Sequence, residues 1–140
     1  RKIKHRETVL LAYCGVLAQN QIIEPLTDIL APMLKKEVSD TFLKKIRCLP
    51  VQKTEQLISI VQKHLQKTPR SAKWLSALGH FAFTGKQYSL AEKSYNSLTN
   101  LEGEQYDEKD LANFAATLSA QENFKAANQL YANILSRRNN

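Results

Sequence analysis

The sequence predicts an all-α fold, an α-solenoid built from antiparallel helix pairs. Apolar residues recur at the three- and four-residue spacing of amphipathic helices along most of the chain, and no segment shows the alternating pattern of a strand. A pattern of small and aromatic residues also occurs twice, with 36 residues between Ala91 and Ala127. Helix pairs repeated at such a spacing bury their apolar faces by stacking, so we expect one stacked domain over residues 1–140.

Four helix pairs are expected, at about 6–37, 40–68, 71–101 and 108–137. In the first pair, a helix over Glu7–Gln19 follows the basic segment Arg1–Arg6. A second helix starts near Glu24 and places Pro25 in its first turn, where the missing N–H is not needed. Pro32 lies inside this helix and is expected to kink it, because proline removes a backbone hydrogen bond and clashes with the preceding turn.

The second pair is expected to be the least regular one. Ser39 or Asp40 is a suitable N-cap for a short helix that ends at Leu49, before Pro50. A longer helix then follows from Thr54 to Leu65. The segment lacks the small residues that mark a close helix crossing in the later pairs, so we interpret it as a degenerate hairpin.

The third pair is predicted at about 71–83 and 89–98, with Gly79 and Ala91 where the two helices cross. Only small side chains let helix axes approach at the short end of the usual range of about 8–10 Å. Tyr88 and Tyr95 are expected to fill the space beside them. The fourth pair repeats the register with Leu111, Phe114, Ala115, Leu118, Phe124, Ala127, Tyr131 and Ile134.

The third and fourth pairs resemble the tetratricopeptide (TPR) repeat. The residues that carry the resemblance are Leu75, Leu78, Gly79, Ala82, Tyr88, Ala91, Tyr95 and Leu98. The resemblance implies a right-handed superhelix with a concave face, and a protein-interaction module rather than a particular chemistry.

The first helix of each such pair lines the concave face, which predicts a groove for a peptide or a partner helix. The groove residues expected from the register are Lys73, Ser76, His80, Phe83, Thr84 and Lys109. The competing interpretation is that His80 is an ordinary surface residue. Chaperone-binding relatives of this fold hold a terminal carboxylate with Lys and Asn. Here those positions carry Ser76, His80, Ala112 and Ala116, so a chaperone-tail adaptor is not expected.

The net charge of +7 is unevenly distributed, with +8 on residues 1–73 and −1 on residues 74–140. A basic half favours acidic partners or an anionic membrane surface, although dispersed lysines are also typical of a solvated helix face. Only the segment Arg1–Arg6 is densely basic. No aromatic stacking residues are interleaved with it, so nucleic acid is not an expected partner.

The sequence contains no catalytic motif, and we expect no enzyme activity and no catalytic residues. The three histidines, His5, His64 and His80, are scattered over different expected elements. Cys14 and Cys48 form neither a CxxC pair nor the spacing of a zinc site, which favours reduced thiols and no bound metal.

The whole chain is also similar to the C-terminal part of the bacterial HemY family, TPR proteins associated with late protohaem biosynthesis. The resemblance rests on the basic segment Arg1–Arg6, the run Thr41–Leu49 followed by Lys53–Leu57, and Pro69-Arg70 before Trp74–Gly79. It implies a protein of the bacterial inner membrane whose spans precede this domain, with the repeats facing the cytoplasm. A chain that begins at Arg1 is then expected to be excised from a longer membrane-anchored protein.

The HemY resemblance implies a non-catalytic scaffold for late haem-pathway enzymes and carries no active-site residues over to this chain. We expect no cofactor. Two alternatives remain open. One is a haem or porphyrin carrier, for which the candidate axial ligands are His80, His64, Cys14 and Cys48. The other is a TPR peptide adaptor with no connection to haem.

Overall fold

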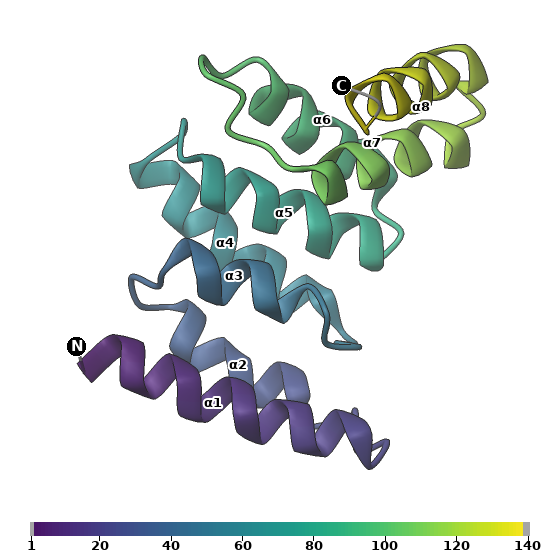
Figure 1. Ribbon diagram of the computed structural model, residues 1–140. Helices are drawn as coiled ribbons and strands as arrows, with labels where there is room; N and C mark the ends of the chain where they lie inside the picture. The colour runs from purple at the N-terminus through teal and green to yellow at the C-terminus, as the bar shows by residue number, and fades with distance from the viewer. Residues whose placement is uncertain (1, 139–140) are drawn as a thin grey trace.

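The structure, a computed structural model, describes residues 2–138 and is all-helical over this range. Eight helices follow one another without a strand in the described part of the chain (Figure 1). Their bounds are α1 Lys2–Gln19, α2 Leu26–Leu34, α3 Asp40–Ile46, α4 Thr54–Lys67, α5 Ala72–Thr84, α6 Tyr88–Thr99, α7 Glu108–Ala120 and α8 Phe124–Arg138. The expected all-α class is confirmed.

The helix ends differ from the expected ones mainly in the first half. The first helix was expected from Glu7 and begins at Lys2, so most of the basic segment is helical and only Arg1 lies outside the described residues. Helix α2 continues for two residues past Pro32 and then ends at Leu34. Ser39 caps α3 as expected, because its hydroxyl accepts a 3.1 Å hydrogen bond from the Phe42 N–H.

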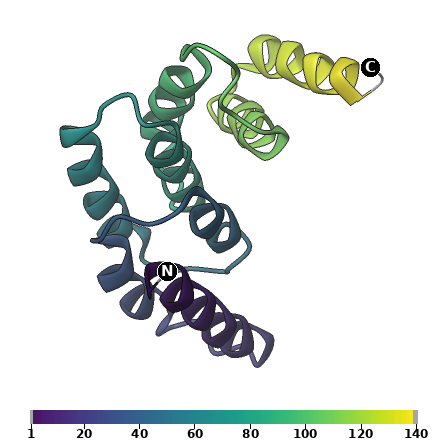
Figure 2. The same cartoon turned by 60° about the vertical axis from the view of Figure 1, so that its left-hand side comes forward.

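The odd-numbered helices follow one another along one side of the molecule. Helix α1 lies against α3, α3 against α5, and α5 against α7 (Figure 1). Helices α2 and α4 pack against each other behind this row, and α6 packs against both α5 and α7. As a result α1 and α8 lie at opposite ends of the molecule (Figures 1 and 2).

The pair expected at 40–68 is not a closed hairpin. Among the helices that the structure describes, α3 and α4 are not neighbours: α3 packs against α1 and α5, whereas α4 packs against α2 and α5 (Figure 2). The connection between them buries Val51 and includes Lys53 with a positive φ of 54°. A short helix without small residues provides no surface for a close crossing, and α5 fills the space instead.

The core is best developed around α5. Trp74, Tyr95, Phe42 and Phe81 are its largest fully buried side chains. The Tyr95 ring stacks on Phe114, with 5.9 Å between the ring centroids, and its hydroxyl accepts a 3.0 Å hydrogen bond from the Asn113 amide. One tyrosine of α6 therefore joins α6 to α7, and burial raises its pKa.

The fourth helix pair, α7 and α8, repeats the sequence pattern of the third pair, but its matching aromatic residues are not buried. Tyr131 and Phe124, which match Tyr95 and Tyr88, are exposed on α8, whereas Ala127 and Ile134 are buried. The difference arises because Tyr95 is covered by α7, while α8 packs only against α7 among the described helices.

Candidate functional site

The six residues expected to line a groove lie on α5 and α7, which pack side by side. The structure therefore brings their two helices together. It also uses several of these side chains for contacts within the fold, which changes what each residue offers to a partner.

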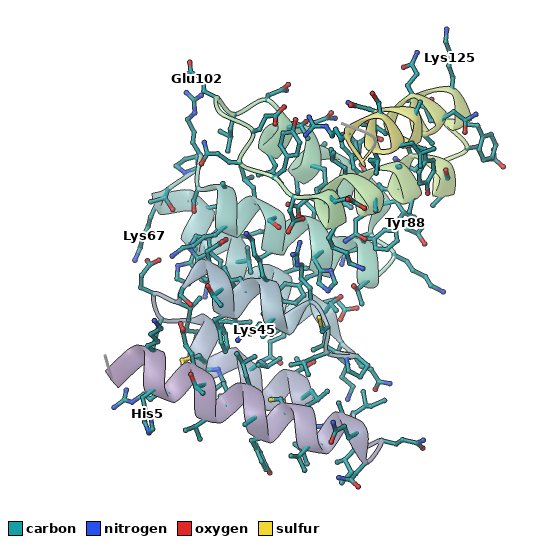
Figure 3. The ribbon with its side chains drawn as sticks, in the orientation of Figure 1. His5, Lys45, Lys67, Tyr88, Glu102 and Lys125 are labelled. Carbon is teal, nitrogen blue, oxygen red and sulfur yellow. The ribbon has the colours of Figure 1, made fainter. Side chains whose placement is uncertain are left out.

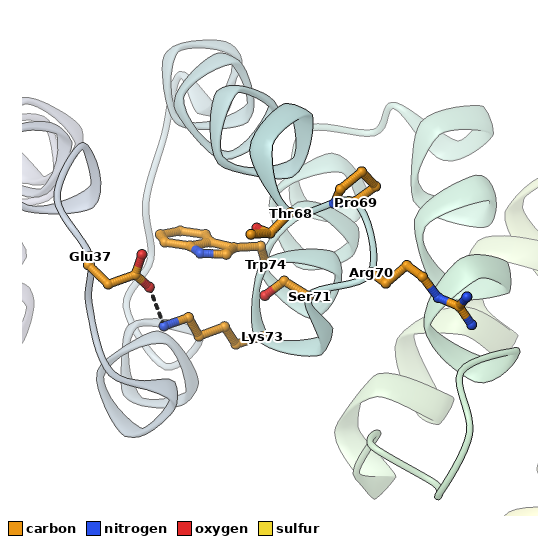
Figure 4. Close-up of a pocket in the computed structure, with 7 residues that line it drawn as sticks. All are labelled: Glu37, Thr68, Pro69, Arg70, Ser71, Lys73 and Trp74. Atoms are coloured by element: carbon orange, nitrogen blue, oxygen red, sulfur yellow. Dashed lines mark hydrogen bonds and ion pairs between the residues drawn. The ribbon is translucent and has the colours of Figure 1, made fainter.

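Lys73 is occupied by an ion pair at the edge of the molecule. Its ammonium group donates to Glu37 Oε1 at 2.5 Å and to the Val38 carbonyl at 2.6 Å. The hydrogen bond from Lys73 lowers the pKa of Glu37. Figure 4 shows this ion pair beside Trp74, with Arg70 pointing away from it. These residues line an open hollow of about 520 Å³. Lys73 thus fastens the loop after α2 to α5.

Ser76 belongs to a partly buried polar cluster that joins three helices. Its hydroxyl donates to Asp110 Oδ1 at 2.6 Å. The Arg47 guanidinium, at the end of α3, donates to Asp107 Oδ2 at 2.7 Å and to Asp110 Oδ1 at 3.3 Å. Asp107 and Asp110 also cap the start of α7, each accepting from the backbone N–H of the other. The cluster connects the end of α3, the middle of α5 and the start of α7.

The pKa values of the two carboxyl groups in this cluster are shifted in opposite directions. Partial burial opposes ionisation of Asp107, but the hydrogen bonds from Arg47 and from the Asp110 backbone outweigh it and lower its pKa to about 2. The more buried Asp110 has a raised pKa, because burial outweighs the hydrogen bonds that it accepts. Arg47 carries the balancing charge, and its side chain is only 11% exposed. We interpret the cluster as a structural junction.

His80 lies in the interior, which corrects both expectations for it. His80 is 7% exposed, and its buried Nδ1 atom has no hydrogen-bond partner among the described residues. Burial, followed by the positive charges of Arg47 and Lys109, lowers its pKa to about 4. A ring at this depth is neither a free groove residue nor a surface residue, because α7 packs beside α5.

Phe83, Thr84 and Lys109 are the more accessible members of the expected groove. Phe83 is half-buried and packs edge to face on Tyr88, with 6.2 Å between the ring centroids. Thr84 and Lys109 are exposed. The surface that a partner could reach on α5 and α7 is therefore smaller than the register suggested.

Arg47, Asp107 and Asp110 were missed at the sequence level. The two aspartates had a local signal, since a capping residue followed three positions later by an acidic one marks a helix start. Arg47 had none, because it lies far away in the sequence and its register predicts only an exposed helix end.

The candidate haem ligands lie on separate elements. His64 on α4 stacks on Trp74 at 3.8 Å between ring centroids, and its Nε2 lies 2.7 Å from the Leu34 carbonyl oxygen. His80 and Cys14 are buried, and Cys48 is exposed in the connection after α3. Because both candidate histidines are held or enclosed by protein groups, His64 and His80 do not fit haem ligation.

No group of acidic, cysteine and histidine side chains within residues 2–138 is arranged to hold a metal ion. The described helices also include none that is both long enough and apolar enough to cross a bilayer.

Comparisons of the chain with protein-family models, with curated proteins and with solved structures found no match.

Proposed function

We propose that this chain is a non-catalytic protein-interaction scaffold. In this proposal its helices form a TPR-like α-solenoid, a right-handed superhelix whose odd-numbered helices present a continuous face to partners. The supporting observation is that α1, α3, α5 and α7 follow one another as neighbours along one side of the molecule. A face built from successive helices suits the recognition of an extended or helical protein segment.

The proposed biological setting comes from the sequence resemblance to HemY proteins. In this setting the scaffold serves late protohaem biosynthesis at the bacterial inner membrane, where it holds haem-pathway enzymes. The basic half of the chain would favour an anionic membrane surface, to which each nearby Lys or Arg contributes about 1 kcal/mol. Binding to anionic vesicles that falls as salt is added is the expected behaviour.

The test is affinity capture from a detergent-solubilised bacterial membrane extract. The parent chain is compared with a variant carrying Thr84→Arg and Lys109→Glu, which changes two exposed residues of the expected groove. Each new charge complements the dipole at its own helix end, so this variant is expected to fold. Lys125→Glu on α8 is a matched control, because it changes the charge of an exposed residue outside α5 and α7.

Late haem-pathway enzymes captured by the parent and the control, and lost on the double variant, would support the scaffold and its face. Capture of proteins unconnected with haem would favour an adaptor of another pathway. The same proteins on all three baits would show that α5 and α7 do not provide the binding face.

A further inference from the structure

Helix α1 has two adjacent apolar sides, and one of them is exposed on the surface. Val9, Tyr13 and Val16 are 55%, 54% and 55% exposed. Their spacing of four and three residues places them in one stripe along the helix. Cys14 is fully buried, and Leu10 and Leu17 pack against the core on the adjacent side of the helix. We call the stripe formed by Val9, Tyr13 and Val16 the outer face of α1.

The outer face borders a hollow between α1 and α2. This hollow has a volume of about 390 Å³ and an apolar floor. Its lining residues are His5, Arg6, Val9, Leu10, Tyr13 and Met33. Figure 3 shows His5 directed away from the neighbouring helices. A concave apolar site with polar edges suits a projecting side chain better than it suits a flat lipid surface.

The arrangement of the helices leaves this face without a neighbour in the described chain. Helix α3 has α1 on one side and α5 on the other, and α5 is enclosed in the same way by α3 and α7. Helix α1 has only α3 in this row. A further helix on the outer face would therefore continue a packing mode that the molecule already uses.

The charges around the hollow select the partner. His5 and Arg6 line the hollow and are exposed, and within residues 2–138 no ion pair joins either of them to a carboxylate. The only acidic residue of α1 is Glu7, which is buried and accepts hydrogen bonds from Ser39. A second copy of α1 would bring like charges together, whereas carboxylates would be attracted.

We propose that the outer face of α1 binds an amphipathic helix of a partner protein. The apolar stripe of that helix covers Val9, Tyr13 and Val16, and one of its side chains enters the hollow. Its Asp or Glu residues lie against Arg6, which lines the hollow. This inference rests on the proposed scaffold function and assigns it a surface separate from the α5 and α7 groove.

The test uses the whole protein in its own cells, with a photo-reactive benzophenone residue in place of Tyr13. After irradiation, the crosslinked segment is identified by mass spectrometry. We expect a segment from another protein that has apolar residues at helical spacing and flanking Asp or Glu. Adding Arg6→Glu should reduce the crosslink yield at least fivefold. The matched control places the benzophenone at Tyr131, an exposed tyrosine on α8, and should not capture the same segment.

Several results would overturn the inference. They are crosslinks to lipid, to a second copy of the chain, to another segment of the same chain or to a segment without acidic residues, and no crosslink at all. An unchanged yield with Arg6→Glu would also contradict it. If the crosslink fails while membrane-extract capture still depends on Thr84 and Lys109, the scaffold stands and only the α1 surface is wrong.

Discussion

The Tyr95 ring lies directly over the backbone of Gly79. A Cβ atom built on Gly79 would be 2.6 Å from Tyr95 Cζ and less than 3.0 Å from two further ring carbons. Because Tyr95 is fully buried between α5 and α7, its ring has no free space to move into. We expect Gly79→Ala to lower the free energy of unfolding by about 1–3 kcal/mol, as overpacking does in other cores. Urea unfolding followed by circular dichroism measures this change.

Gly15 provides the matched comparison. It lies inside α1, and a Cβ atom there would meet nothing within 4 Å. Gly15→Ala should therefore raise the free energy of unfolding by about 0.5–1 kcal/mol, because alanine favours the helix and nothing opposes the methyl group. Equal effects at the two glycines would show that helix propensity, not the Tyr95 contact, determines the response.

The buried His80 predicts a loss of stability in mild acid. Its pKa in the folded protein is about 4, below the ordinary 6.5. Between these values the unfolded chain binds a proton that the folded chain does not, so stability falls as the pH decreases through this window. The expected loss between pH 7 and pH 5 is about 2 kcal/mol.

His80→Gln should abolish most of this dependence of the free energy of unfolding on pH, since the glutamine side chain does not titrate. Urea unfolding at pH 7 and pH 5 measures it for the parent and the variant. His5→Gln is the matched control, because it makes the same exchange at an exposed histidine on α1. A parent whose stability is equal at the two pH values would contradict the burial of His80.

Asp107 predicts a separate loss at lower pH. Its pKa in the folded protein is about 2, so the stability that its charge provides is complete above the ordinary value near 4 and is lost as the pH falls through about 2. The side chain is 35% exposed, and solvent screening reduces the effect to about 1 kcal/mol.

Asp107→Asn isolates that charge, because asparagine also caps a helix. The variant should be less stable than the parent at pH 7, and most of this difference should be lost by pH 2, as measured by thermal unfolding. An undiminished difference at pH 2 would mean that the cap or the packing, not the ion pair with Arg47, was lost.

Glu7 is the buried link between α1 and the start of α3. It accepts hydrogen bonds from the Ser39 N–H at 2.8 Å and the Ser39 hydroxyl at 2.7 Å. We expect Glu7→Leu to cost about 1–3 kcal/mol, because both donors lose their acceptor in a partly buried site. Glu7→Gln keeps one acceptor oxygen and should cost less. Calorimetry of the three proteins gives the order, and equal values for Gln and Leu would contradict the role of the hydrogen bonds.

The sequence predicted the helices of the second half closely because their apolar periodicity is regular. Expected bounds of 71–83 and 89–98 compare with Ala72–Thr84 and Tyr88–Thr99. The small residue at Gly79 and the large one at Tyr95 also meet as expected. Local pattern is sufficient here, because the two helices of this pair share the most extensive contact among the described helices.

The polar cluster and the separation of α3 from α4 were not predictable in the same way. Arg47 reaches Asp107 only because α3, α5 and α7 form a row, and nothing near Arg47 in the sequence encodes that contact. The groove residues show the same limit. Helical register places His80 on a particular side of α5, but only the position of α7 decides that this side is closed.

The single tryptophan lies midway along the row of helices, where its ring stacks on His64 between α4 and α5. Its fluorescence therefore reports the state of the centre, whereas circular dichroism averages over all the helices. In molecules whose units contact only their neighbours, the ends can open before the centre does. Coincident denaturation curves from the two signals would indicate a single cooperative unit, and earlier loss of ellipticity than of the tryptophan signal would reveal fraying from the termini.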